Sequence, residues 1–324
     1  MNKLVNTISI GITTALLSTA AMAEPVEVRI ASHVSELSPL HAQSQLFAEE
    51  IEKRLPGEFV FKLFPSGQLG KEKDLMSNVQ AGSLEMINVA SGVMKLDKKL
   101  GVFDLPWLFN DREHVQRAMS AGLEDAVRTQ IESVGGVKVI GVYENGFRHV
   151  INSKRKVVDP EDLDGLKIRI SGGKFRQGVF QKMGATPQSV PWGETFTALQ
   201  SGVVDGAEAA AYGFYEQKQY EVAGHLSTTR HVYTPSFLLA SNAFFNSLSD
   251  EQKTVFAEVG RSITEAAYAK SAELETKYLN EMQSKLEVND VNLPAFQSAT
   301  ESSYDDYISS QGDDYLVFVR ETAK

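Results

Sequence analysis

Val26-Glu27-Val28-Arg29-Ile30 alternates apolar and charged side chains, which is the pattern of a strand with one buried face. Ser38-Pro39 then predicts the start of a helix, because serine caps helices well and proline is tolerated in the first turn. A strand over 59–63, a helix over 71–80 and an apolar strand over 86–90 follow. Because parallel strands need crossover connections, this β-α-β-α-β order predicts an α/β fold with a mostly parallel sheet flanked by helices.

A second series of the same kind begins farther along the chain. Residues 137–142 predict a strand, and Leu166-Lys167-Ile168-Arg169-Ile170 predict another, with the apolar side chains on one face and the two cations on the other. The helix that follows has an apolar stripe that indicates core packing, formed by Phe175, Val179, Phe180 and Met183. Beyond it we expect a short helix over 194–201, strands at 203–204 and 236–241, a helix after the capping box Ser249-Asp250-Glu251-Gln252, and a long helix-rich tail that passes Met282.

No Pro/Gly/Ser-rich linker separates the two series, and no fixed-period repeat is present. We therefore expect two lobes that are tied by crossing strands and can hinge. The expected boundaries are 24–147 for lobe I, with 235–273 returning to it, and 148–234 for lobe II, with 274–324 packing on it and across the lobes.

The first residues predict an export signal. Lys3 supplies a positive start, an apolar stretch covers 4–17, and Ala21-Met22-Ala23 forms an A-x-A cleavage site. A membrane anchor is the competing interpretation, but the stretch contains polar residues and is shorter than the roughly 20 apolar residues that a span needs. We expect a signal peptide at 1–23 that is cleaved after Ala23.

The composition excludes several classes of protein. The chain has no Cys, which excludes disulfides and thiolate metal sites. Among the charged residues the signal peptide removes only Lys3, so the mature chain keeps 31 basic and 42 acidic residues and a formal charge of −11. Such an acidic balance argues against a nucleic-acid partner. An anionic ligand would have to be attracted by a few local cations.

Arg169 is the best candidate for such a cation, because it ends a strand just before Ser171-Gly172-Gly173 and ligands of open α/β sheets bind at the carboxyl ends of strands. Its planar fork can give two parallel hydrogen bonds to a carboxylate, although a solvated strand face is the alternative. Asp205 and Glu208 are the most prominent pair of acidic residues that could contact a ligand. The alternative is that they stabilise a turn and the start of a helix. The six histidines are scattered without metal-ligand spacing, and no nucleophile elbow, Walker A or dinucleotide-binding pattern is present.

Several segments resemble the periplasmic solute-binding subunit of tripartite ATP-independent periplasmic (TRAP) transporters, the DctP-like family, over essentially the whole mature chain. The segments are Pro65-Ser66-Gly67-Gln68-Leu69-Gly70 with Glu72, the run 103–109, and the ordered block 165–208, which contains Gly165-Leu166-Lys167-Ile168-Arg169, Met183-Gly184-Ala185-Thr186-Pro187, Pro191-Trp192-Gly193-Glu194 and Val204-Asp205-Gly206-Ala207-Glu208.

The resemblance implies a two-lobed periplasmic binding protein fold with hinge strands and a long C-terminal helix, located in the periplasm. It implies a monomer that captures a small organic acid, with a sugar acid favoured, and delivers it to integral membrane permease subunits. It implies no enzyme activity, no cofactor and no metal. A dicarboxylate, keto acid or aromatic acid ligand, or a periplasmic hydrolase or lyase, is the alternative.

The resemblance also assigns site residues. Arg169 clamps the ligand carboxylate, Arg148 assists, Trp192 packs on the ligand, and Glu72 and His33 face the cleft from the other lobe. Glu208 belongs to the same expected site. Relatives often carry Asn directly after this segment, whereas this chain has Ala209, so Tyr212 or Tyr215 is expected either to replace the lost hydrogen bond or to pack in the core.

Overall fold

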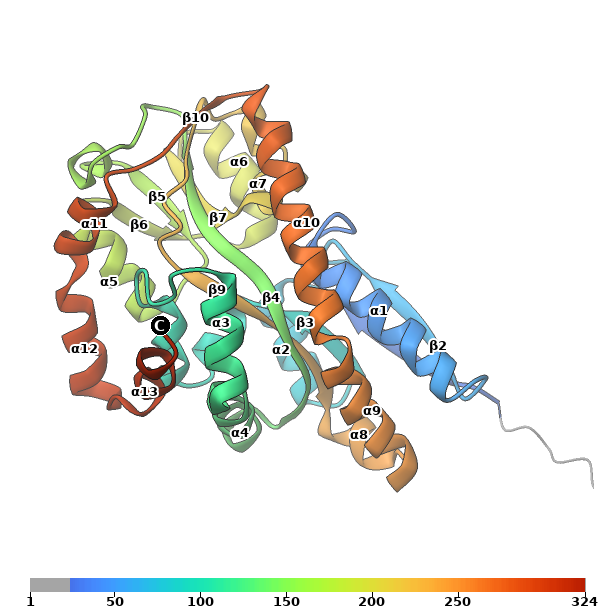
Figure 1. Cartoon of the computed structure of the whole chain (residues 1–324). Coiled ribbons are helices and arrows are strands. Elements are labelled where there is room, and N and C mark those ends of the chain that lie inside the picture. The colour runs from blue at the N-terminus through green and yellow to red at the C-terminus, as the bar shows by residue number, and fades with distance from the viewer. Residues whose placement is uncertain (1–23, 324) are drawn as a thin grey trace, which may run out of the picture.

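The computed structural model describes residues 24–323, so the signal peptide expected at 1–23 lies outside the described part. Two α/β lobes are joined by strands that run between them (Figure 1). The strand order through the sheet is β2-β1-β3-β9-β4-β7-β5-β6, with β8 beside β4 and β10 beside β8. The expected α/β class and two-lobed architecture are confirmed.

Lobe I follows the β-α-β-α-β order expected from the sequence. Ser38 caps α1 by accepting a hydrogen bond from the His41 amide at 3.2 Å, and Pro39 takes the first helical position. β1 pairs in parallel with both β2 and β3. The elements of lobe I are β1 (Val26–Ala31), α1 (Pro39–Arg54), β2 (Phe59–Phe64), α2 (Glu72–Gln80), β3 (Met86–Val89), η1 (Ser91–Lys95), η2 (Lys98–Asp104), α3 (Arg112–Ala118), η3 (Met119–Leu123), α4 (Glu124–Gly135), β9 (Tyr233–Ser241), α8 (Asn242–Ser247) and α9 (Asp250–Ser262).

The strand expected at 137–142 is much longer than predicted. β4 (Val137–Asn152) pairs antiparallel with β9 up to residue 147 and with β7 (Gly206–Ala210) from residue 148. Asn145-Gly146, an ordinary turn signal, is absorbed at a bulge where Gly146 has a φ of 123°. One continuous strand therefore crosses from lobe I to lobe II, and the sheet is mixed rather than mostly parallel.

Lobe II repeats the alternation of strands and helices. β5 pairs in parallel with β6 and β7. The strand expected at 203–204 is wrong, because Val203 is 59% exposed in a loop and the strand begins at Gly206. The elements of lobe II are η4 (Pro160–Leu163), β5 (Lys167–Ile170), α5 (Lys174–Lys182), β6 (Thr186–Ser189), η5 (Trp192–Glu194), α6 (Thr195–Gln200), β7, α7 (Ala211–Glu216), η6 (Gln219–Glu221), β8 (His225–Ser227) and β10 (Glu287–Asn289).

The C-terminal helices tie the lobes together. α10 (Thr264–Gln283), the long helix expected to pass Met282, contacts β4, α1 of lobe I and α7 of lobe II (Figure 1). α11 (Leu293–Thr300) contacts α5. α12 (Ser302–Gln311) contacts α5 and η2, and α13 (Asp314–Glu321) contacts α3. The tail thus packs on both lobes.

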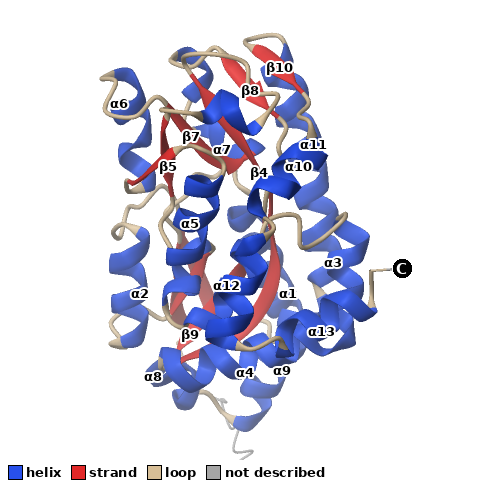
Figure 2. Cartoon of the chain, turned by 90° about the vertical axis from the view of Figure 1, so that its left-hand side faces the viewer, coloured by secondary structure: helices blue, strands red, loops and turns tan. Residues whose placement is uncertain are grey.

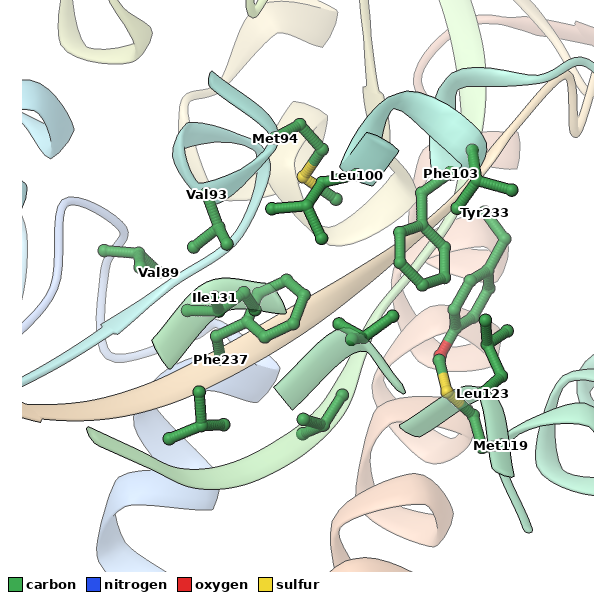
Figure 3. Close-up of a cluster of buried hydrophobic side chains, with 14 of the residues drawn as sticks. Val89, Val93, Met94, Leu100, Phe103, Met119, Leu123, Ile131, Tyr233 and Phe237 are labelled. Atoms are coloured by element: carbon green, nitrogen blue, oxygen red, sulfur yellow. The ribbon is translucent and has the colours of Figure 1, made fainter. Parts of the chain in front are cut away.

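Helices enclose the strands in both lobes (Figure 2), and the apolar cores lie between the strands and these helices. In lobe I, side chains from β3, η1, η2, α4 and β9 form one apolar cluster (Figure 3), which includes Val89, Leu100, Phe103, Ile131 and Phe237. None of the helices between residues 24 and 323 is long and apolar enough to cross a membrane.

Candidate functional site

A cavity of about 390 Å³ lies between the two lobes, a size suited to a small organic molecule. Lobe I contributes the β1–α1 loop, residues 66–74 and the segment around η1. Lobe II contributes the carboxyl ends of β5 and β6, η5 and the β7–α7 junction. β4 adds Asn145 and Arg148 where it passes between the lobes. The cavity thus lies at the edge of the sheet where α/β proteins bind ligands.

Arg169 is held at the floor of this cavity by β5, whose neighbours Ile168 and Ile170 are buried in the core of lobe II. Its side chain is buried, and its Nε donates to the carbonyl oxygen of Val190 at 2.9 Å. No carboxylate within residues 24–323 lies within 4.0 Å of its guanidinium. Burial lowers the pKa of Arg169 to about 10, because the charged form loses its hydration without a partner. The sequence expectation of an anion site at Arg169 fits this geometry.

Lys167, the second cation of the same strand, does not take part. Its side chain is exposed and does not line the cavity, so the alternative of a solvated strand face holds for Lys167. The amide of Lys167 donates to Asp205 at 3.0 Å in the turn before β7, which fits the turn interpretation of that aspartate.

Arg148 also reaches the cavity, but it is already paired. Its Nε forms an ion pair with the Glu208 carboxylate, and its Nη2 donates to the Glu208 carbonyl at 2.9 Å. Burial alone would raise the pKa of Glu208, but the charges of Arg148 and Arg176 and the nearby His231 ring, whose Nε2 lies 3.5 Å from the carboxylate, hold it well below its usual range. Glu208 is fully buried and does not line the cavity. Glu208 was expected among the residues of the binding site, but it lies behind the cavity wall, where its carboxylate pairs with Arg148.

Arg176, on α5, was not expected in the site. It is fully buried and pairs with Asp104 of lobe I, and its Nη1 lies 3.5 Å from Glu208 and 2.6 Å from the Ser171 hydroxyl. A signal was present in the sequence, because an arginine at 176 shares the helical face of Val179, Phe180 and Met183. A cation on the buried face of a helix indicates that a carboxylate is buried beside it.

Together these side chains leave an excess of positive charge beside the cavity. Arg148 and Arg169 line it and Arg176 lies behind them, and these three arginines are opposed by two carboxylates that do not line it, Asp104 and Glu208. A buried charge is costly unless it is paired, so a ligand carboxylate beside Arg169 would balance the group.

The opposite wall, from lobe I, carries the carboxylate of Glu72. Glu72 Oε1 accepts hydrogen bonds from the amides of Ala90 at 3.2 Å and Gly92 at 3.0 Å. Burial would raise the pKa of Glu72, but His33 and these two amides lower it below its usual value. His33 Nδ1 lies 3.9 Å from Glu72 Oε1, and burial lowers the histidine pKa, which favours the neutral ring. Both residues line the cavity, as expected from the sequence.

Aromatic side chains complete the lobe II wall. The guanidinium carbon of Arg169 lies 5.1 Å from the centre of the Trp192 ring, a cation–π distance. Tyr212 donates to Asn145 Oδ1 at 2.6 Å, and both of these residues line the cavity beside Ala209. Tyr215 stacks on Tyr278 with ring centres 4.7 Å apart and does not line the cavity. Tyr212 and Asn145 therefore supply the polar groups beside Ala209.

Comparison with known proteins gives consistent matches. A model of the family described as bacterial extracellular solute-binding protein, family 7 (DctP), matches residues 30–311. The 2,3-diketo-L-gulonate-binding periplasmic protein of Escherichia coli (strain K12) is 31% identical over 238 residues, which cover 73% of this chain and 72% of that protein.

Two solved structures match the fold with TM-scores of 0.87. A TRAP periplasmic solute-binding protein from Polaromonas sp. JS666, bound to D-erythronate, is 27% identical, and the match covers 91% of this chain and 98% of that one. The sugar acid binding protein of Advenella mimigardefordensis strain DPN7T, in complex with galactonate, is 26% identical, with 93% and 98% covered. Within residues 24–323, no cluster of three or more His, Asp or Glu side chains could hold a metal ion.

Proposed function

The chain belongs to family 7 of the bacterial extracellular solute-binding proteins, and we propose that it captures a small organic acid, with a sugar acid favoured, and delivers it to the permease of a TRAP transporter. The observation that carries this proposal is the buried guanidinium of Arg169, which faces the cavity without a carboxylate partner in the described part of the chain. A ligand carboxylate would satisfy its free donors, whereas a neutral analogue would leave them unpaired.

The lobe I wall supports a hydroxyl-bearing ligand. Glu72 is held as a carboxylate and can accept hydrogen bonds from hydroxyl groups, while it repels a second acid group placed beside it. A polyhydroxy acid with its carboxylate at Arg169 and its hydroxyls toward Glu72 and His33 fits both walls.

One observation favours the alternative, a dicarboxylate. Lys95 of lobe I lines the cavity and, within residues 24–323, forms no ion pair. Its Nζ lies 3.2 Å from the point that a Cβ on Gly172 would occupy, so it reaches lobe II. A second carboxylate directed at Lys95 rather than at Glu72 would use this cation.

Capture would proceed by closure of two lobes with the boundaries 24–147 plus 235–273 and 148–234 plus 274–324. The change of partner in β4 at residue 148, from β9 to β7, supports the first boundary. The proposed location is the periplasm, after cleavage behind Ala23, and the proposed partner besides the ligand is the integral membrane permease.

A thermal-shift screen tests this function. Sugar acids, dicarboxylates, keto acids and aromatic acids are each added to the purified protein, and mass spectrometry identifies any acid that co-purifies. A ligand at a hundred times its dissociation constant stabilises the protein by about 2.7 kcal/mol. We expect a sugar acid to give the largest shift, its amide to give none, and the acid to be recovered unchanged. An equal shift with the neutral amide, or conversion of the acid to a product, would contradict the proposal.

A further inference from the structure

Trp192 of lobe II also contacts lobe I, at the edge of the cavity. Its indole packs against an apolar cluster formed by Val34, Leu40 and Ala90 of lobe I. This contact removes apolar surface from water only while the lobes are together, so it favours the closed arrangement.

Glu216, the last residue of α7, joins the same two lobes through hydrogen bonds. Its Oε2 accepts from the Ser35 amide at 3.0 Å and from the Ser35 hydroxyl at 2.6 Å, and Ser35 lies in the β1–α1 loop of lobe I. Its Oε1 accepts from Trp192 Nε1 at 2.8 Å. One carboxylate therefore holds the loop of lobe I and the indole of lobe II at the same time.

The indole held in this way forms part of the binding wall. One side of the Trp192 ring lies against Gly213, where an added Cβ would come within 3.0 Å of the ring. The Arg169 guanidinium lies 5.1 Å from the ring centre. The position of Trp192 thus affects the environment of Arg169, and Glu216 fixes that position.

We propose that Glu216 is a positioning residue that latches the lobes, so that closure of the cleft and alignment of Trp192 beside Arg169 occur together. The inference rests on the proposed function in one respect, namely that closure serves to hold a ligand. Glu216 is partly buried in this contact, and desolvation raises the pKa of its carboxyl group to about 7.

The distance between the lobes tests the latch. The chain has no Cys, so two introduced cysteines can be spin-labelled specifically. Ser77→Cys on α2 of lobe I and Ser201→Cys after α6 of lobe II are exposed positions for the labels. The distances between the labels are measured by pulsed electron paramagnetic resonance, without ligand and with D-galactonate, D-glucuronate, D-erythronate or succinate. Calorimetry gives the affinity for the same four acids.

Glu216→Ala is expected to shift the label distances toward longer values and to weaken binding by about tenfold or more, that is, by at least about 1.4 kcal/mol. Trp192→Phe, which lacks the indole donor, is expected to have a smaller effect in the same direction. In the Glu216→Ala background, Ser35→Ala is expected to add no further opening, because the two side chains act through one contact. Glu221→Ala is the matched control, since Glu221 is exposed and makes no side-chain hydrogen bond or ion pair within the described chain.

Wild-type distances and affinity in Glu216→Ala would overturn the inference, as would an unreduced effect of Ser35→Ala in that background. If Glu216→Ala does not fold, Ser35→Ala combined with Trp192→Phe removes two of the three donors to the carboxylate, and unchanged label distances in that double variant overturn the inference. A wild-type protein that binds none of the four acids but opens on Glu216→Ala would contradict the ligand class and uphold the latch. A wild-type protein that neither binds them nor joins its lobes contradicts both.

Discussion

Arg148 is bound to Glu208 both through an ion pair between the side chains and through a hydrogen bond from Nη2 to the Glu208 carbonyl at 2.9 Å. Within residues 24–323 the neighbouring Arg169 has no such partner, although both side chains are buried at the same cavity. The two arginines therefore differ in what a ligand could gain from them. Arg148 is held by the protein and can offer only a secondary contact, while Arg169 retains free donors for an anion.

The first prediction concerns affinity. Arg169→Ala should weaken binding of the acid by roughly 3 kcal/mol, about a hundredfold or more, because the ligand carboxylate would be buried without its partner. Lys167→Ala is the matched control, since Lys167 lies on the same strand, carries the same charge and is exposed. Calorimetry should show an unchanged affinity for the control, and an unchanged affinity for Arg169→Ala would rule out the assignment.

The second prediction concerns stability without ligand. Burial lowers the pKa of Arg169 to about 10, which indicates that its charge is unfavourable where it lies. Arg169→Met should therefore raise the free energy of unfolding of the ligand-free protein by about 1–3 kcal/mol, since it removes an unpaired buried charge. Urea unfolding of dialysed protein measures this, and a loss of stability would mean that Arg169 is satisfied by the protein itself.

The third prediction concerns the carboxylate behind the cavity. Glu208→Gln should lower the free energy of unfolding by roughly 3–5 kcal/mol, because Arg148 and Arg176 would lose a buried counter-charge. The exposed Glu221→Gln serves as the control and should leave stability within about 0.5 kcal/mol. A mild effect of Glu208→Gln would indicate that Asp104 alone balances the arginines.

The fourth prediction concerns pH. His231 is fully buried, with Nε2 3.5 Å from Glu208 and Nδ1 2.8 Å from the Thr229 hydroxyl, and burial lowers its pKa to about 4. Between about pH 6.5 and 4 the unfolded chain therefore binds a proton at this histidine that the folded chain does not. The free energy of unfolding should fall by up to roughly 3 kcal/mol as the pH is lowered through this range.

Urea unfolding at pH 7 and pH 4.5 checks this. His231→Gln should lose less stability between the two pH values than the wild type. His225→Gln, at a partly exposed position beside Glu287, should follow the wild type. An equal loss of stability in His231→Gln and the wild type would show that other groups cause the loss of stability at acidic pH.

Local patterns predicted several elements correctly, because caps and periodicity act over a few residues. The Ser249 capping box at the start of α9 is confirmed, and so is the strand β1, in which Val28 and Ile30 are buried as expected although Val26 at its start is exposed. The full length of β4 was missed, because Asn145-Gly146 carries a turn signal and only pairing with β9 and β7 makes it part of a strand. Tertiary contacts overrode the local signal there.

Family resemblance together with strand position placed Arg148, Arg169 and Trp192 at one cleft, and all three line the cavity, but the pairing of the arginines was not predicted. Nothing in the order of residues tells that Arg148 is already matched by Glu208 while Arg169 is free. Arg176 and Glu216 were missed, because their partners, Asp104 and Ser35, are distant in the sequence and lie in the other lobe. Such contacts depend on how the lobes meet.

A crystal structure of the protein with its co-purified or screened acid tests the central claim most directly. The measured quantity is the distance between the ligand carboxylate oxygens and the guanidinium nitrogens of Arg169. We predict two contacts of about 2.7–2.9 Å, with the rest of the ligand between Trp192 and Glu72. A ligand held elsewhere, with Arg169 satisfied by protein groups alone or turned to solvent, would contradict the account.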